Sequence, residues 1–396
     1  MEKHNWPQRG EAVLMNTFKR DGKVMVSGQG SFLTDAEGRT YLDFISGIAV
    51  NSLGHSNEKL VETLVNQGQQ LIHSSNLFWN TPSIQLAEKL TKLSGLGKVF
   101  FANSGAEANE GAIKLARKWG REVKGPNATT IVTMMQSFHG RTMATLAATG
   151  QEAMHKDYAP NLPGFDYVTF NDIDQLKATI TPQTCAVLIE VIQGEGGVNT
   201  LSEDFVQAIN EIQQEKQVLV IIDEVQTGIG RTGSYFAYEQ FDLDPDIITL
   251  AKGLGGGFPI GAFLAKDDLA THFQVGDHGT TFGGNPLATA CANIVLDTIN
   301  EDNLLNNVNQ RHKQLVEGLQ VLQAKHPTIS SIKGRGLLIG IQFDQAVDDI
   351  INDCFDQGLL VISAKGNVIR FLPPLNVSEE EINQALDIFG AVLSTQ

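Results

Sequence analysis

An aspartate and a lysine follow two short apolar runs in the middle of the chain. Asp223 comes directly after residues 218–222, and Lys252 follows residues 247–250. Since ligands of parallel α/β sheets bind beyond the carboxyl ends of the strands, both side chains are expected to face one cleft. A buried lysine loses its proton readily, and its neutral amine can attack an aldehyde. A carboxylate beside a pyridine nitrogen keeps that nitrogen protonated, so the ring withdraws electrons.

Taken alone, the acid and the lysine could equally well form a salt bridge or be two solvated loop charges. A phosphate site nearby would favour the cofactor chemistry. Ser104, Gly105 and Ala106 follow an apolar run at 99–101 and open an amphipathic stretch that is predicted as a helix. Backbone N–H groups at a helix start, with a glycine that permits close approach, can bind an anion. The alternative is helix capping, because Ser104 and Glu107 have the spacing of a capping box.

A third segment follows the apolar run at 130–132. Phe138 could lie flat on a planar ligand, and Arg141 could hold a carboxylate with two hydrogen bonds. An aromatic residue in such a place is more often part of the core. This segment is therefore consistent with a ligand-binding cleft but is weak evidence for one. His139 is expected to form structural hydrogen bonds only.

Other kinds of site are excluded by spacing. The glycines at 253, 255 and 257 lack the third glycine that the dinucleotide motif G-x-G-x-x-G requires. The chain contains no P-loop, no G-x-S-x-G and no His/Cys cluster with the spacing of a metal site. We therefore expect no metal ion in the site.

Composition restricts the class of partner. The 396 residues include 42% hydrophobic and 19% charged residues, which is typical of a globular protein, and the net charge is −16. Such an acidic balance argues against nucleic acid and anionic membranes as partners. No apolar stretch is long enough to span a membrane, and the N-terminus lacks the pattern of a signal peptide. With three widely spaced cysteines, these features predict a cytoplasmic protein.

The order of apolar runs predicts an α/β fold. Short buried runs alternate with amphipathic stretches such as residues 107–119 and 205–215, which indicates a mostly parallel sheet covered by helices on both faces. We assign residues 56–290 to this large domain. Residues 1–55 and 291–396 are expected to form a smaller α+β domain from both termini.

Six motifs resemble the ornithine and acetylornithine group of class III aminotransferases, which use pyridoxal 5′-phosphate (PLP). They come in the family's order over residues 30–380 and begin at Asn103, Phe138, Gln193, Asp223, Ala251 and His278. The resemblance implies the PLP-dependent aminotransferase fold type I and PLP as the cofactor. One departure is Val191, where the family usually has proline, and it changes no catalytic atom.

The resemblance implies a role for each residue around PLP. The residues are Ser104, Gly105 and Ala106 at the phosphate, Phe138 and Val225 on the two ring faces, Asp223 at the ring nitrogen, Gln226 at the ring hydroxyl, and Lys252 as the Schiff-base lysine. Thr281 resembles the residue that reaches the phosphate of the neighbouring subunit, which implies a homodimer with shared active sites.

The resemblance also implies the substrate contacts. Arg141 and Thr280 match substrate-contacting positions, and Arg370 matches the arginine that receives a substrate α-carboxylate. Glu195 would pair with Arg370 while the donor is bound and release it for the acceptor, which carries an extra carboxylate. The alternative is a static salt bridge between the two.

Within the family, the motifs are most similar to the branch that acts on N-acetylornithine. The resemblance therefore implies transfer of the terminal amine to 2-oxoglutarate by a ping-pong mechanism, in arginine biosynthesis. Ornithine, succinylornithine and 4-aminobutyrate aminotransferases are the nearest alternatives. A non-catalytic PLP-binding protein would be expected to lack Lys252 or Arg141, and both are present. A PLP-dependent mutase or decarboxylase is a further alternative.

Overall fold

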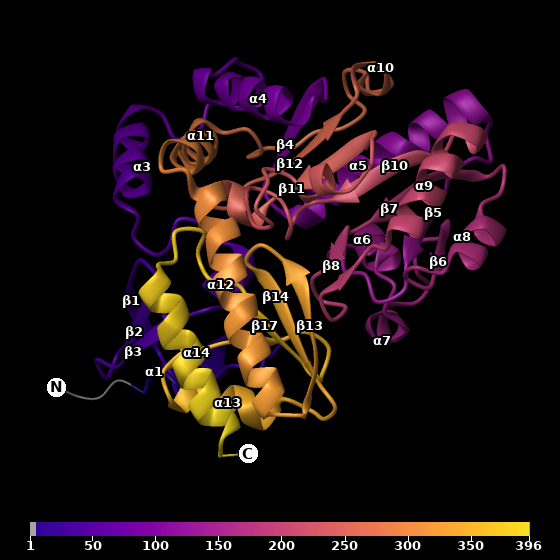
Figure 1. Cartoon of the computed structure of the whole chain (residues 1–396). Helices are drawn as coiled ribbons and strands as arrows, with labels where there is room; N and C mark the ends of the chain where they lie inside the picture. The colour runs from indigo at the N-terminus through magenta and orange to yellow at the C-terminus, as the bar shows by residue number, and fades with distance from the viewer. Residues whose placement is uncertain (1–4, 396) are drawn as a thin grey trace.

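The computed structural model describes residues 5–395, and its centre is a seven-stranded sheet in the order β4-β12-β11-β10-β7-β5-β6 (Figure 1). The strands are β4 (Lys98–Ala102), β5 (Thr130–Met134), β6 (Phe165–Val168), β7 (Thr184–Ile189), β10 (Leu219–Asp223), β11 (Ile247–Leu250) and β12 (Gly261–Ala265). β5, β6, β7, β10 and β11 run parallel, whereas β12 is antiparallel to both of its neighbours. The prediction of a mostly parallel sheet is confirmed.

Helices cover both faces of this sheet. Alternate residues of β10 belong to different hydrophobic clusters, Val220 and Ile222 to one and Leu219 and Ile221 to the other. Helix α9 (Glu203–Lys216) contributes to the first cluster, and α5 (Gly105–Trp119) contributes to the second. Because side chains of a strand alternate between faces, the two helices lie on opposite sides of the sheet.

The apolar runs that lead into the site are strands at the expected positions. β6 and β12 lay outside the sequence predictions, because β6 contains Asp166 and β12 contains Gly261 and two alanines, which are weak strand formers. In the parallel pair β10 and β11, Asp223 is opposite Thr249. This register places the carboxyl end of β11, and Lys252 beyond it, at the same edge of the sheet as Asp223.

The first and last parts of the chain share a second sheet. Its strands are β1 (Met25–Gln29), β2 (Phe32–Asp35), β3 (Thr40–Asp43) and β15 (Leu359–Leu360), and β15 pairs in parallel with β3. A third sheet contains β13 (Ile329–Arg335), β14 (Leu338–Phe343), β17 (Val368–Phe371) and β16 (Ile362–Ser363). The division into a large domain of residues 56–290 and a small domain from both termini stays a prediction, which the β3–β15 pairing favours.

Three helices lie side by side at one end of the central sheet. They are α3 (Glu58–Gln70), α4 (Thr81–Ser94) and α11 (Pro286–Glu301), and α11 contacts the other two. Helix α11 begins with Asn285 as its N-cap and Pro286 in its first turn. The helix continues without a break past residue 290, the predicted end of the large domain. The long α12 (Leu304–Lys325) follows and packs against α14 (Glu379–Leu393), as Figure 1 shows in orange and yellow.

The remaining elements are short. They are α1 (Trp6–Val13), α2 (Ser46–Ala49), α6 (Met143–Ala148), α7 (Glu152–His155), α8 (Ile173–Thr179), α10 (Asp267–Ala270), α13 (Asp348–Asp356), β8 (Ile192–Gln193), β9 (Asn199–Thr200), η1 (Gly120–Lys124), η2 (Lys156–Tyr158), η3 (Ala237–Gln240) and η4 (Lys252–Gly255). The expectation that the N-terminus lacks a signal peptide falls partly on residues 1–4, which lie outside the described residues.

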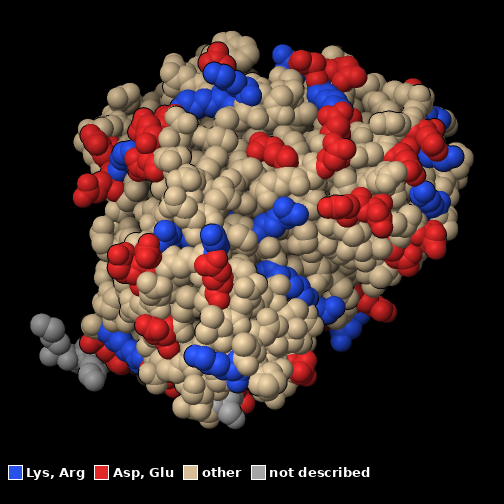
Figure 2. Space-filling view, viewed as in Figure 1, with Lys and Arg blue, Asp and Glu red and all other residues tan. Residues whose placement is uncertain are grey.

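The surface carries charges of both signs. On the face in Figure 2, acidic and basic side chains are interspersed, and no broad area is covered by one sign alone. Within residues 5–395, none of the helices combines the length and the apolar character needed to cross a lipid bilayer.

Candidate active site

A cavity of about 450 Å³ lies at the carboxyl edge of the central sheet. The predicted cofactor and substrate residues that line it are Ser104, Gly105, Ala106, Phe138, Arg141, Asp223, Val225, Gln226 and Lys252. These residues come from segments up to 148 positions apart in the chain, from 104 to 252. The fold therefore gathers an amine, an acid and a helix start around one space.

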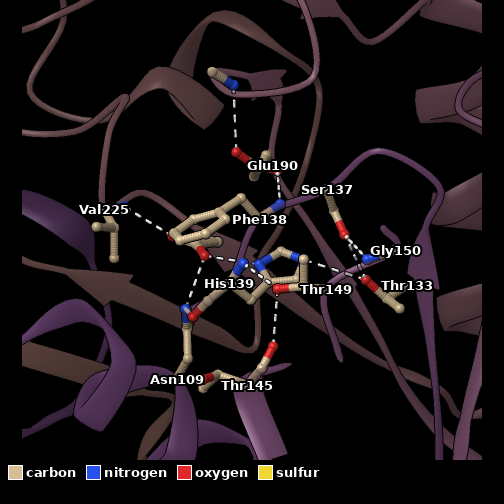
Figure 3. A network of polar contacts seen from close by, with 12 residues as sticks. Asn109, Thr133, Ser137, Phe138, His139, Thr145, Thr149, Gly150, Glu190 and Val225 are labelled. Carbon is tan, nitrogen blue, oxygen red and sulfur yellow. Dashed lines mark hydrogen bonds and ion pairs between the residues drawn. The ribbon is translucent and has the colours of Figure 1, made fainter. Parts of the chain in front are cut away.

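Asp223 is buried and held from three sides. Its Oδ2 accepts a hydrogen bond from Asn109 Nδ2 at 2.8 Å and lies 2.8 Å from His139 Nδ1, and its Oδ1 accepts from the N–H of Val225 at 3.0 Å. Figure 3 shows Asn109 and His139 close together in this network of polar contacts. His139 is held in turn by Thr133, whose Oγ1 lies 3.2 Å from Nε2. These contacts fix where the negative charge points.

Sequence analysis missed Asn109 and gave His139 no specific partner. Asn109 lies on α5, only 1% exposed, on a face otherwise made of small and apolar residues. A buried asparagine needs hydrogen-bond partners, so its polar side chain on an apolar helix face was the available signal. Nothing local in the sequence could indicate that the partner is Asp223.

Lys252 begins the short helix η4 with a φ of 45°, in the left-handed region. A non-glycine residue in this conformation is strained, and such strain concentrates at functional sites. Burial lowers the pKa of the Lys252 amine, and although the negative charge of Glu195 opposes the effect, the pKa stays below its ordinary value. The amine is therefore more readily neutral than that of a surface lysine.

The start of α5 also lines the cavity. Ser104 is the N-cap, and its Oγ accepts a hydrogen bond from the N–H of Glu107 at 3.2 Å. The Glu107 carboxylate accepts from the N–H of Asn103 at 2.7 Å, so the reciprocal bond of a capping box goes to the residue before the cap. The first N–H groups of a helix have no intrahelical partner, which leaves those of Gly105 and Ala106 suited to an anion.

Gly105 is required by a close approach. A Cβ at this position would lie 2.8 Å from Cγ1 of Val225, a contact too short for two carbon atoms. Val225 follows β10, so the glycine lets the helix start and the strand end come together. Any larger residue would push the start of α5 away from Val225.

Phe138 and Val225 both line the cavity. The guanidinium of Arg141 lies 5.6 Å from the centre of the Phe138 ring, and the arginine is exposed. The backbone N–H of Phe138 donates to Glu190 Oε2 at 3.1 Å (Figure 3). Glu190 also lines the cavity, and sequence analysis assigned it no role.

Arg370 and Glu195 form an ion pair next to the cavity without being part of its lining. Arg370 is fully buried, and its Nη1 donates to Glu195 Oε1 at 2.7 Å and to Gln226 Oε1 at 2.9 Å. Burial, the largest single effect, would raise the pKa of Glu195. The charge and hydrogen bond of Arg370, together with the Lys252 charge and a hydrogen bond from Gln226, lower that pKa below its usual value. Within residues 5–395, Nε and Nη2 of Arg370 have no partner.

Thr280 and Thr281 do not line the main cavity. Thr280 lines a neighbouring cavity of about 350 Å³, and its Oγ1 accepts from Asn103 Nδ2 at 3.2 Å. Thr281 is exposed on the loop before α11. Within the described residues of a single chain, Thr281 is thus not part of the cavity lining that contains Ser104, Gly105 and Ala106.

The cavity fits a small aromatic aldehyde with a phosphate arm. It offers a helix start for the phosphate, a held carboxylate for a ring nitrogen, and an amine whose pKa is lowered by burial. In the part of the chain that the structure describes, no group of three or more His, Cys, Asp or Glu side chains could hold a metal ion.

Known relatives cover nearly the whole chain. Acetylornithine aminotransferase from Caldanaerobacter subterraneus subsp. tengcongensis is 51% identical over 96% of this chain and 97% of its own length. Acetylornithine aminotransferase from Methanocaldococcus jannaschii is 43% identical over 100% of this chain and 99% of its own length.

Solved structures share the fold. Ornithine aminotransferase from Toxoplasma gondii superimposes with a TM-score of 0.94 at 30% identity, over 98% of this chain and 94% of its own. N-acetylornithine aminotransferase from Stenotrophomonas maltophilia gives a TM-score of 0.84 at 36% identity, over 98% of both chains. The sequence model of the family described as aminotransferase class-III matches residues 18–393. This protein therefore belongs to the class-III aminotransferases.

Proposed function

We propose that this enzyme is an N-acetylornithine:2-oxoglutarate aminotransferase of arginine biosynthesis. The main support is the convergence of Lys252, Asp223 and the start of α5 on one cavity, in a chain whose relatives carry the name acetylornithine aminotransferase at 43–51% identity. The expected products are N-acetylglutamate 5-semialdehyde and glutamate.

The cofactor of this family is PLP, and the predicted residues on the cavity wall have positions that support their proposed roles. Gly105 and Ala106, with Ser104, would hold the phosphate at the helix start. Phe138 and Val225, on the cavity wall, would contact the two faces of the ring. When bound, PLP supplies an aldehyde for amine exchange and a ring that withdraws electrons.

Asp223 and Gln226 would orient the ring from its polar edge. Asp223, held by Asn109 and His139, would keep a proton on the ring nitrogen, because a buried carboxylate stabilises a neighbouring positive charge. Gln226 would reach the ring hydroxyl through Nε2, since its Oε1 already accepts from Arg370.

Lys252 would do the acid–base work. Its amine, with a pKa lowered by burial, can be neutral and can take a proton from the amine-bearing carbon of the donor. Within the same half-reaction it would deliver that proton to the carbon of the cofactor's aldehyde group. In the second half-reaction it would move a proton the opposite way, onto the keto carbon of the acceptor. The two half-reactions use one site in turn, which predicts ping-pong kinetics.

Arg370 and Glu195 would select between the two substrates. In the first half-reaction their ion pair neutralises the arginine, so an uncharged aliphatic chain can lie beside it. In the second, a carboxylate of 2-oxoglutarate would replace Glu195, and the unpartnered Nε and Nη2 of Arg370 supply donors for it. Arg141 and Thr280 would contact the remaining substrate groups.

We further propose a homodimer that shares its active sites. Leu77, Phe78 and Trp79 are largely exposed, and Asn76 Nδ2 donates to the carbonyls of Thr280 and Gly283. An exposed apolar segment thus adjoins the loop of Thr281. A second copy of the chain that covered this segment would place its own phosphate site next to Thr281 of the first copy. A cytoplasmic location is supported by three buried free cysteines, Cys185, Cys291 and Cys354.

A donor panel tests the proposal. Purified enzyme with PLP is given N-acetylornithine, ornithine, N-succinylornithine or 4-aminobutyrate, with 2-oxoglutarate as acceptor, and kcat/KM is measured for each. N-acetylornithine should be preferred, and a tenfold preference for another donor, about 1.4 kcal/mol of transition-state free energy, would overturn the substrate assignment. Ornithine is the most informative alternative donor in this panel, since an ornithine aminotransferase shares this fold with a TM-score of 0.94.

A further inference from the structure

Glu190, like Asp223, is an acidic residue at the carboxyl edge of the sheet. Ile189 of β7 pairs with Ile222 of β10, so Glu190 follows its strand beside Asp223. Glu190 is 5% exposed and lines the cavity. It is therefore close to the reaction space without any role in the chemistry assigned above.

The Glu190 carboxylate joins two backbone segments. Its Oε2 accepts a hydrogen bond from the N–H of Phe138 at 3.1 Å, and its Oε1 accepts from the N–H of Gly194 at 3.3 Å. Figure 3 shows Glu190 above the Phe138 ring, with a dashed line between its carboxylate and the backbone nitrogen of Phe138. Phe138 and Gly194 lie in separate loops, so Glu190 connects them directly.

The two bonds require an ionised carboxylate. A carboxylate offers two acceptor oxygens and no donor, whereas a glutamine accepts at one atom and turns an NH₂ group toward the other N–H. Burial raises the pKa of Glu190, and the neighbouring Asp223 carboxylate adds to that effect, while His139 opposes it. Keeping an ionised acid here costs free energy, and the two charge-assisted hydrogen bonds offset that cost only in part, since the pKa stays raised to about 7.

Both segments lead to side chains of the proposed mechanism. Phe138 would stack on the ring, and Gly194 directly precedes Glu195, the partner of Arg370. Gly194 also packs closely on Gln226, since a Cβ at Gly194 would lie 2.2 Å from Gln226 Oε1. One buried acid thus links the wall beside the ring to the loop that carries the ion pair.

We propose that Glu190 is a positioning residue that holds the Phe138 wall and the Glu195 loop at a set separation. This inference rests on the proposed aminotransferase function. With the loop backbone anchored at Gly194, only the side chain of Glu195 has to move when a dicarboxylate arrives. Without the anchor, both the orientation of the ring and the selection at Arg370 change together.

The test compares holoenzymes of E190Q, E190D and E224Q with the unsubstituted protein. Glu224 is a matched control, because it is 1% exposed and its carboxylate accepts from the hydroxyl of Thr227 and the N–H of Tyr238, neither of which belongs to the loops of Phe138 and Gly194. The readouts are the visible circular dichroism of bound PLP, which reports ring orientation, and kcat and KM for 2-oxoglutarate.

E190Q should bind PLP with an altered dichroic band and should raise the KM for 2-oxoglutarate about tenfold, the effect of losing one charged hydrogen bond. E190D keeps two acceptors and should recover part of both signals, while E224Q should match the unsubstituted enzyme. Unchanged dichroism and KM in E190Q, or equal changes in E190Q and E224Q, would overturn the inference. If E190Q fails to fold, E190D decides, and unchanged signals there also overturn it.

The proposed function is tested separately by the unsubstituted enzyme. If that enzyme transfers no amino group from any donor in the panel, the proposed function fails. The dichroic band of bound PLP still compares E190Q with E224Q in that case.

Discussion

Arg370 donates a 2.7 Å hydrogen bond to Glu195, a residue 175 positions earlier in the chain. Arg370 is fully buried on β17, while Glu195 is on the loop between β8 and β9. A buried guanidinium is unfavourable unless it is paired, so Glu195 stabilises the empty site as well as shaping it. At this ion pair the enzyme would distinguish substrates that carry one carboxylate from substrates that carry two.

Replacing Glu195 by glutamine should shift substrate selection toward dicarboxylates. The amide is a weaker partner for Arg370, so a substrate carboxylate competes better for the guanidinium. We expect the ratio of kcat/KM for glutamate to kcat/KM for N-acetylornithine to rise roughly tenfold. E317Q is the control, because Glu317 pairs only with Lys313 on the exposed surface of α12. An unchanged ratio in E195Q would support a static salt bridge.

Lys252→Ala should abolish turnover while the fold is retained. Removing the amine that moves the proton should lower kcat by at least roughly 10⁴-fold. Far-ultraviolet circular dichroism and the thermal midpoint check the fold, and initial rates with N-acetylornithine check activity. Lys266→Ala is the matched control, since that lysine pairs with Asp244 and Asp246 away from the cavity. Substantial activity in Lys252→Ala would contradict the role of this amine.

Asp223→Asn should lower kcat in both half-reactions by roughly 10²- to 10⁴-fold, because the ring nitrogen loses the charge that keeps it protonated. Affinity for PLP should fall much less, since the phosphate site at α5 is untouched. Single-turnover absorbance measures each half-reaction, and equilibrium dialysis measures PLP binding. Asp246→Asn, before β11 at the opposite edge of the sheet, should leave both values near those of the unsubstituted enzyme. A kcat loss below tenfold in Asp223→Asn would argue against the pyridine contact.

Glu224→Gln should change how stability depends on pH. Burial raises the pKa of Glu224 from 4.5 to about 7, so the folded state holds this proton more tightly than the unfolded state. The stabilising effect of the proton is complete below about pH 4.5 and is lost as pH rises through about 7. The variant has no such loss, and relative to the unsubstituted protein it should gain roughly 3 kcal/mol in free energy of unfolding between about pH 5 and pH 8. Denaturant unfolding at both pH values measures the difference, and parallel profiles for the two proteins would refute it.

The sequence by itself was enough to identify the family and its cofactor, and it also nominated the residues that we propose carry the chemistry. Lys252 and Asp223 could be identified because each follows an apolar run, and local periodicity predicts strands well. The predicted phosphate-binding turn at Ser104 could be identified because the start of a helix has short-range sequence signals. These features depend on residues a few positions apart, which a linear pattern contains.

Only the tertiary structure decided which side chains support these residues. Asn109 and Asp223 are 114 positions apart, and Glu190 and Phe138 are 52 apart, yet each pair is hydrogen-bonded. Such contacts arise when the helices and strands pack, and the free energy of burying an acid depends on every neighbour at once. A linear pattern shows that Glu190 is acidic, but its position between two loops of the active site exists only in the folded chain.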